Sequence, residues 1–67
     1  MKIRFTRNVL VDVEKTRLQE VWDKHFTRWD ELKIESITYY GKTASFLTND
    51  GDYVANVPID SFEVINQ

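Results

Sequence analysis

The feature that most constrains this fold is a hairpin pattern between Lys42 and Ile65, K-T-A-S-F-L-T-N-D-G-D-Y-V-A-N-V-P-I-D-S-F-E-V-I. Asp50-Gly51 separates two runs of strand-forming residues, and a type I′ turn needs positive φ at both central positions. Pro58 ends the second run because it fixes φ and starts a tight turn. The order is strand, turn, strand, one-turn helix and strand. It predicts a small β-barrel.

A two-residue loop at Asp50-Gly51 also sets which residues share a face of the hairpin. In that register Thr48 faces Tyr53, Leu47 faces Val54, Phe46 faces Ala55 and Ala44 faces Val57. We expect the face with Phe46 and Ala55 to enter the core, because a large side chain then opposes a small one. The Leu47–Val54 pair is expected on the other face.

The first half of the chain begins with a strand pattern from about Lys2 to Lys15. Apolar and polar residues alternate through Ile3 and Phe5, and again through three valines at positions 9, 11 and 13. This period of two is typical of a half-buried strand. Arg7-Asn8 interrupts the pattern, which predicts a bulge or a bend there.

Residues 16–29 fit two conformations. Leu18, Val21, Trp22, Phe26 and Trp29 have helical spacing, and Thr16 and Gln19 have the spacing of a capping box. The segment has no alanine and a single leucine, however, and its β-branched and aromatic residues suit a pleated surface. The composition favours a long β-arm over a short helix, and both remain open at this point.

The remaining strand runs from Leu32 to Tyr39, with Gly41 in the turn that follows. Ile37 lies on its mostly polar face, which indicates a bent strand of the kind found in small barrels. Phe62 to Ile65 should form a last strand that pairs with the first. We therefore expect one all-β domain over residues 1–67, with five to six strands, a long arm loop at residues 14–30 and a one-turn 3₁₀ helix near residues 58–61.

Composition narrows the compartment and the partners. The chain has no cysteine and a formal net charge of −2, which does not favour a polyanionic partner. Residues 1–34 carry a net charge of +2 and residues 35–67 carry −4. The apolar runs are too short to cross a bilayer, and M-K-I-R-F-T-R lacks the apolar core of a secretory signal. We expect a cytoplasmic protein with no membrane partner.

No motif predicts catalysis, a cofactor or a metal. His25 is the single histidine, and its neighbours are Lys24 and Phe26. The acidic residues around Gly51 are explained by turn chemistry, since a calcium loop needs further spaced oxygen ligands. The serines lack a nucleophile motif, and two glycines cannot make a phosphate loop. We expect a protein that is not an enzyme.

The aromatic residues are the open question, since Trp22, Trp29, Tyr39, Tyr40 and Tyr53 are many for so small a core. One interpretation is that the arm residues Trp22, Phe26 and Trp29 fold over the barrel and seal it. Another is that exposed Trp and Tyr anchor a protein partner. A third is that they stack on single-stranded nucleic acid beside the basic residues of the arm.

The order of elements resembles that of SH3-like barrels, of a small bacterial type. V-P-I-D-S-F-E-V looks like the closing segment of that fold, with one extra residue, Ile59, after the proline. R-W-D-E-L-K-I looks like the turn after the arm loop, and Trp29 stands where the family has glycine. The A-L-Y-D-Y signature of proline-motif binding is absent, because N-V-L-V-D-V occupies that place.

The resemblance implies an interaction module or a small accessory subunit, because fold alone does not assign a specific role. The candidate surface for a protein partner combines the arm with the closing turn. Its residues are Trp22, Arg28, Trp29, Tyr40, Pro58 and Phe62. The alternative is a nucleic-acid-binding small barrel that uses the basic first half.

Overall fold

The computed structural model describes residues 1–15 and 17–66, which form an all-β protein as the sequence predicted. The strands of the first half are β1 (Lys2–Phe5), β2 (Val9–Lys15), β3 (Glu20–Phe26) and β4 (Glu31–Tyr40). Those of the second half are β5 (Thr43–Thr48), β6 (Tyr53–Pro58) and β7 (Phe62–Asn66). A short 3₁₀ helix, η1 (Ile59–Ser61), lies between β6 and β7, within the range expected for it.

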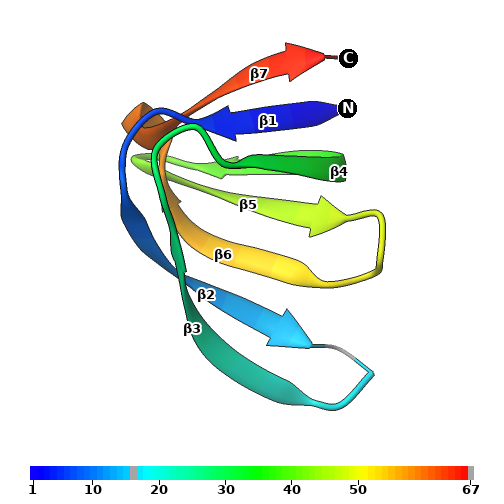
Figure 1. Ribbon diagram of the computed structural model, residues 1–67. Helices are drawn as coiled ribbons and strands as arrows, with labels where there is room; N and C mark the ends of the chain where they lie inside the picture. Colours follow the sequence, from blue (N-terminus) through cyan, green and yellow to red (C-terminus); the bar gives the residue numbers. More distant parts are fainter. Residues whose placement is uncertain (16, 67) are drawn as a thin grey trace.

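The strands form one antiparallel sheet in the order β3-β2-β6-β5-β4-β1-β7. The sheet is strongly curved, with the β2–β3 hairpin at one end and β1 and β7 at the other (Figure 1). Its end strands, β3 and β7, do not pair with each other. The sheet is therefore not closed, and it has seven strands where five to six were expected.

The extra strands come from the first half of the chain. Residues 6–8 divide the predicted long strand into β1, which lies between β4 and β7, and β2, which lies between β6 and β3. The backbone N–H of Thr6 donates to the carbonyl of Ser61 at 2.8 Å, so the chain is held against η1 as it crosses. The pairing of β7 with β1 is as predicted.

The arm is a β-hairpin, so the β-arm interpretation is confirmed and the helical one is wrong. β3 pairs with β2 along its whole length, from Val9 opposite Phe26 to Lys15 opposite Glu20. The valines of β2 alternate, so they give the hairpin one face that points to the core. A helix in place of β3 would not continue this face. Thr16, half of the capping-box pattern, lies outside the described residues.

The β5–β6 hairpin has a different turn from the predicted one. Leu47 faces Tyr53, and the N–H of Thr48 donates to the carbonyl of Asp52 at 2.9 Å, which leaves a three-residue loop. Gly51 has a φ of 88°, whereas Asp50 has no positive φ. A type I turn followed by a glycine bulge fits this pattern, and a type I′ turn does not.

A bulge in β6 then corrects the register. Phe46 faces Val54, but Ala44 faces Val57 as predicted, so β6 has one more residue than β5 between these pairs. Asn56 lies in this bulge with a φ of 60°. Val54 is consequently a core residue, 2 % exposed, while Ala55 is only half-buried. The predicted places of these two residues were wrong, because turn type and bulge both depend on backbone conformation.

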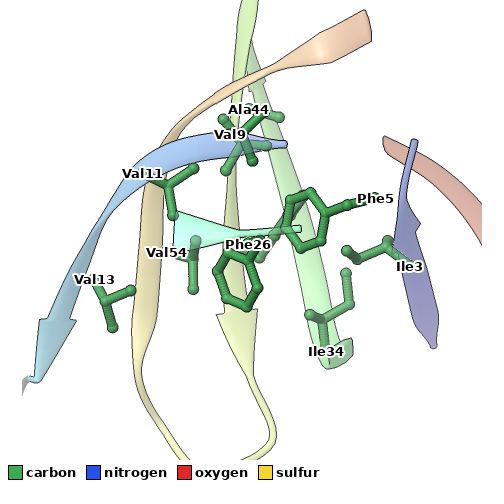
Figure 2. Packing of buried hydrophobic residues seen from close by; sticks show 11 residues of the cluster. Ile3, Phe5, Val9, Val11, Val13, Phe26, Ile34, Ala44 and Val54 are labelled. Carbon is green, nitrogen blue, oxygen red and sulfur yellow. The ribbon is translucent and has the colours of Figure 1, made fainter. Parts of the chain in front are cut away.

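The core lies on the concave side of the sheet (Figure 2). Aromatic contacts join the elements: the rings of Phe5 and Phe26 stack at 4.5 Å between centroids, and Phe46 meets Phe62 edge to face at 4.9 Å. Ile37 packs against the core from β4. The buried apolar residues are Ile3, Phe5, Val9, Val11, Val13, Phe26, Ile34, Ala44, Phe46, Val54 and Val57.

Candidate functional site

The concave side of the sheet is not completely filled, and a groove of about 550 Å³ opens there. One bank is the β2–β3 hairpin, the other is the start of β4, and the β5–β6 turn closes one end. This volume is in the range of small ligand sites. The lining residues are Val13, Lys15, Trp22, Asp23, Lys24, Phe26, Leu32, Lys33, Thr48, Asn49, Asp50, Asp52 and Val54.

Trp22 is the accessible aromatic residue of this groove. It lies in β3 opposite Val13, a core residue, so its side chain belongs to the concave face. The indole N–H donates to the Glu20 carboxylate at 2.8 Å, yet 54 % of the residue is exposed. The ring is therefore held in one orientation while much of its surface is open to a ligand.

Charged groups surround the apolar floor of the groove, by which we mean its lining residues Val13, Phe26, Leu32 and Val54. Lys15 and Asp52 form an ion pair at 2.5 Å that neutralises both at the turn end of the groove. Lys24 lies opposite the core residue Val11, and its ammonium is 5.0 Å from the centre of the Phe26 ring. A cation over an aromatic face is stabilised by the ring. Lys24 thus places a positive charge beside Trp22 on the concave side.

In the part of the chain that the structure describes, one edge of β3 has no strand paired with it, and β3 also lines the groove. Asp23 lies opposite Asp12, on the outer face of the hairpin, yet it also lines the groove. Because the side chain of Asp23 lies on the outer face, we infer that Asp23 lines the groove with its backbone. A strand edge of this kind presents N–H and C=O groups to any extended chain placed there.

Trp29 occupies a separate site, in the turn between β3 and β4. The N–H of Asp30 donates to the carbonyl of Thr27 at 3.0 Å, and Trp29, the third residue of this turn, has a φ of 75°. Positive φ at that position is characteristic of a type II turn and favours glycine.

Arginine side chains cover the Trp29 ring without burying it. The guanidinium of Arg28 lies 4.5 Å from the ring centre and that of Arg4 lies 5.7 Å away. Arg4 also forms an ion pair with Glu63 of β7 at 3.0 Å. The indole is 54 % exposed, and it does not line the groove. Trp22 and Trp29 therefore belong to different surfaces.

Tyr40 lies on the outer face, at the end of β4. Its hydroxyl oxygen is 3.3 Å from that of Tyr53. This hydrogen bond raises the pKa of Tyr40 above its ordinary value. The Ser45 hydroxyl and then Tyr40 lower the pKa of Tyr53. The pair joins β4 to β6 across the outer face and is remote from the groove lining.

Pro58 and Phe62 flank η1. The Ser61 hydroxyl donates to the carbonyl of Pro58 at 2.6 Å, and the Phe62 ring is half-buried against Phe46. These contacts explain both residues as parts of the closing turn. The predicted partner surface is therefore divided among the groove, the β3–β4 turn, the outer face and the closing turn. Sequence reasoning missed Leu32 and Val54 as groove residues. Val54 lies near Trp22 because both residues pair with Val13, and this register depends on the pairing of β2 with β6.

The described residues give no sign of a metal centre. Across residues 1–15 and 17–66, no three His, Cys, Asp or Glu side chains form a group that could hold a metal ion. His25 is exposed and lies opposite Leu10 on the outer face of the hairpin. In the same part of the chain, no helix is long and apolar enough to span a membrane.

Comparison with protein-family models, with curated proteins and with solved structures finds no match to this chain. The geometry of the groove and of its surroundings is therefore the basis for assigning a function.

Proposed function

We propose that this chain is a non-enzymatic SH3-like interaction module, and that it binds an extended segment of a protein partner in the concave groove. The observation that carries the proposal is Trp22, a half-exposed indole fixed by Glu20 beside the apolar floor of the groove. Tryptophan is among the residues most enriched at binding hot spots, because it buries a large area with few rotatable bonds.

The SH3-like assignment is supported by the order of the elements. A first strand is followed by a hairpin arm, three meandering strands, a 3₁₀ turn and a last strand that returns to the first. The arm differs from the expected loop, since β2 also pairs with β6. Of the predicted partner surface, Trp22 of the arm lines the groove, whereas Pro58 and Phe62 flank η1.

The net charge of −2 favours a protein partner over the nucleic-acid alternative. Among residues 1–15 and 17–66, several cations are also engaged by carboxylates: Lys2 by Glu31, Arg4 by Glu63, Arg7 by Asp60 and Lys15 by Asp52. Phosphate binding draws its affinity from cations that release counterions. A chain with a net negative charge is a poor partner for a polyanion, so we expect no mobility shift of single-stranded DNA or RNA even at low salt.

A selection experiment tests the proposed function. A displayed library of random twelve-residue peptides is selected on the wild-type protein, and the affinities of enriched peptides are measured for wild type, Trp22→Ala and Trp29→Ala. We expect Trp22→Ala to weaken binding by about 30-fold, as for a hot-spot residue. Trp29→Ala should change the affinity by less than about threefold, because Trp29 lies outside the groove.

The two tryptophans are matched controls, since both are 54 % exposed. Circular dichroism of each variant establishes that it is folded. The proposal is contradicted if the folded Trp22→Ala protein binds the selected peptides as tightly as wild type does, or if Trp29→Ala alone abolishes binding.

A further inference from the structure

β3 is one of the two edge strands of this sheet, and with seven residues it is longer than β7, which has five. β3 pairs with β2 along all seven of its residues, and within residues 1–15 and 17–66 no strand pairs with its other edge. All its residues except Phe26 are exposed. Natural proteins usually cover such an edge or shorten it. A long, exposed edge beside a groove is a template for one more strand.

The charges along this edge alternate between the two faces. Lys24 lies on the groove side, with Trp22 next to it along the same face. Between them, Asp23 lies on the outer face directly opposite Asp12. Like charges directly opposite each other destabilise a strand pair. A cation beside Asp23 on an added strand would relieve this repulsion.

We propose that the partner's segment adds to β3 as an antiparallel strand with the order acidic, basic, apolar. The acidic side chain lies opposite Lys24 in the groove, the basic one opposite Asp23 on the outer face, and the apolar one opposite Trp22. Antiparallel addition continues the pattern of every other pair in the sheet. This inference rests on the proposed function of the groove and adds the binding mode and the sequence preference.

The groove favours a single extended segment over a second copy of the chain. Its volume is about 550 Å³, and its far bank is formed by Leu32 and Lys33 of β4. A second copy that paired through β3 would bring its own β2 with it, joined along seven residue pairs. A single strand needs no such room.

A reciprocal charge swap tests the proposal. The first probe is acetyl-TTEKLTT-amide, in which Glu, Lys and Leu fall opposite Lys24, Asp23 and Trp22. The second is acetyl-TTKELTT-amide, with the two charges exchanged. Both are titrated at millimolar concentration into ¹⁵N-labelled wild type and into the double variant Asp23→Lys, Lys24→Asp. Dissociation constants come from the chemical shifts of the groove residues.

The wild type should prefer the first peptide by about tenfold, because two favourable cross-strand pairs replace two repulsive ones. The double variant should reverse this preference. Amide exchange should slow at every second residue of β3, because only alternate N–H groups point to an added strand. The wild type and the double variant share the same total charge, so non-specific attraction cannot produce the reversal.

Other results overturn the proposal in distinguishable ways. If both peptides bind both proteins equally, or bind neither, strand addition with this charge order is wrong. If library-selected peptides still need Trp22 for binding in that case, the proposed function is supported and only strand addition to β3 is rejected. If β3 amides become protected with rising protein concentration and no peptide, a second copy occupies the edge.

Discussion

The ring of Phe26, the last residue of β3, stacks on the ring of Phe5 in β1 with 4.5 Å between centroids and 13° between planes. The two residues belong to strands that are not neighbours in the sheet. Phe26 is 7 % exposed and Phe5 is fully buried. This contact fixes the end of the arm over the core, and so determines where the groove and Trp22 lie.

Phe26→Ala should therefore destabilise the protein strongly. Truncation of a buried phenylalanine costs about 3–5 kcal/mol, comparable to the whole stability of a domain of this size. Trp22→Ala should cost about 1 kcal/mol or less, since half of that side chain is already exposed. Urea unfolding at 25 °C measures the free energy of unfolding of both variants. Phe26→Leu is a milder truncation and should give a folded variant of intermediate stability. Equal losses for Phe26→Ala and Trp22→Ala would mean that the tryptophan is a core residue.

Trp29 has a backbone conformation that glycine adopts more easily. Its φ of 75° costs an L-residue about 1–2 kcal/mol. We expect Trp29→Gly to be more stable than Trp29→Ala by about 1 kcal/mol. Both variants lose the contacts with Arg4 and Arg28, so the difference isolates the backbone term. Thermal unfolding gives the comparison, and a more stable alanine variant would contradict the turn assignment.

Asp23 faces Asp12 across the outer side of the arm. Asp23→Thr should stabilise the protein by about 0.2–1 kcal/mol, because it removes a like-charge pair and adds a β-branched residue. Asp12 is the less suitable position, since its carboxylate accepts a hydrogen bond from Asn56 at 2.5 Å. Asp12→Thr is thus the matched control and should gain less. Urea unfolding at low salt measures the free energy of unfolding of the two variants and shows which one is stabilised more.

Asp60 should contribute to stability in a pH-dependent way. The hydrogen bond and the charge of Arg7, whose guanidinium is 2.7 Å from the carboxylate, lower the pKa of Asp60. Since the pKa is lower in the folded state, the contribution is present above the unfolded pKa and is lost as the pH falls through the folded pKa. In Arg7→Gln the pKa of Asp60 should rise toward its ordinary value. An NMR titration of the Asp60 carboxyl in the two proteins measures this, and an unchanged pKa would exclude Arg7 as the cause.

Local pattern was enough to predict much of the fold. The alternating valines predicted β2. Pro58 and the residues after it predicted η1, and the last apolar run predicted β7. Each of these signals depends on residues close together in the chain. The β-arm also followed from composition, although the helical spacing of Trp22, Phe26 and Trp29 competed with it.

The errors came from features that adjacent residues do not specify. The sequence N-D-G-D accommodates either a two-residue or a three-residue loop, and the choice moved the register of β6 by one residue. The bulge at Asn56 then restored the Ala44–Val57 pair. The division of the first strand depends on where β1 and β2 pair, which is a long-range property.

The candidate site was predicted only in part for the same reason. The number of aromatic residues predicted that one or two reach the surface, but not which ones. The interpretation that the arm aromatics seal the barrel holds for Phe26, which is 7 % exposed, and is wrong for Trp22 and Trp29, which are both 54 % exposed. The groove depends on a sheet that curves without closing, and curvature brings Leu32 toward the arm. Phe62 looked like a surface anchor, although its ring packs on Phe46.

The most direct test of the account maps a library-selected peptide onto the ¹⁵N-labelled protein. We expect the largest shifts at the Trp22 indole and at the backbone of Val13, Leu32 and Val54, all of which line the groove. Tyr40 and the Trp29 indole should move little. Shifts centred instead on Tyr40 and the closing turn, or on Trp29, would contradict the groove as the binding site.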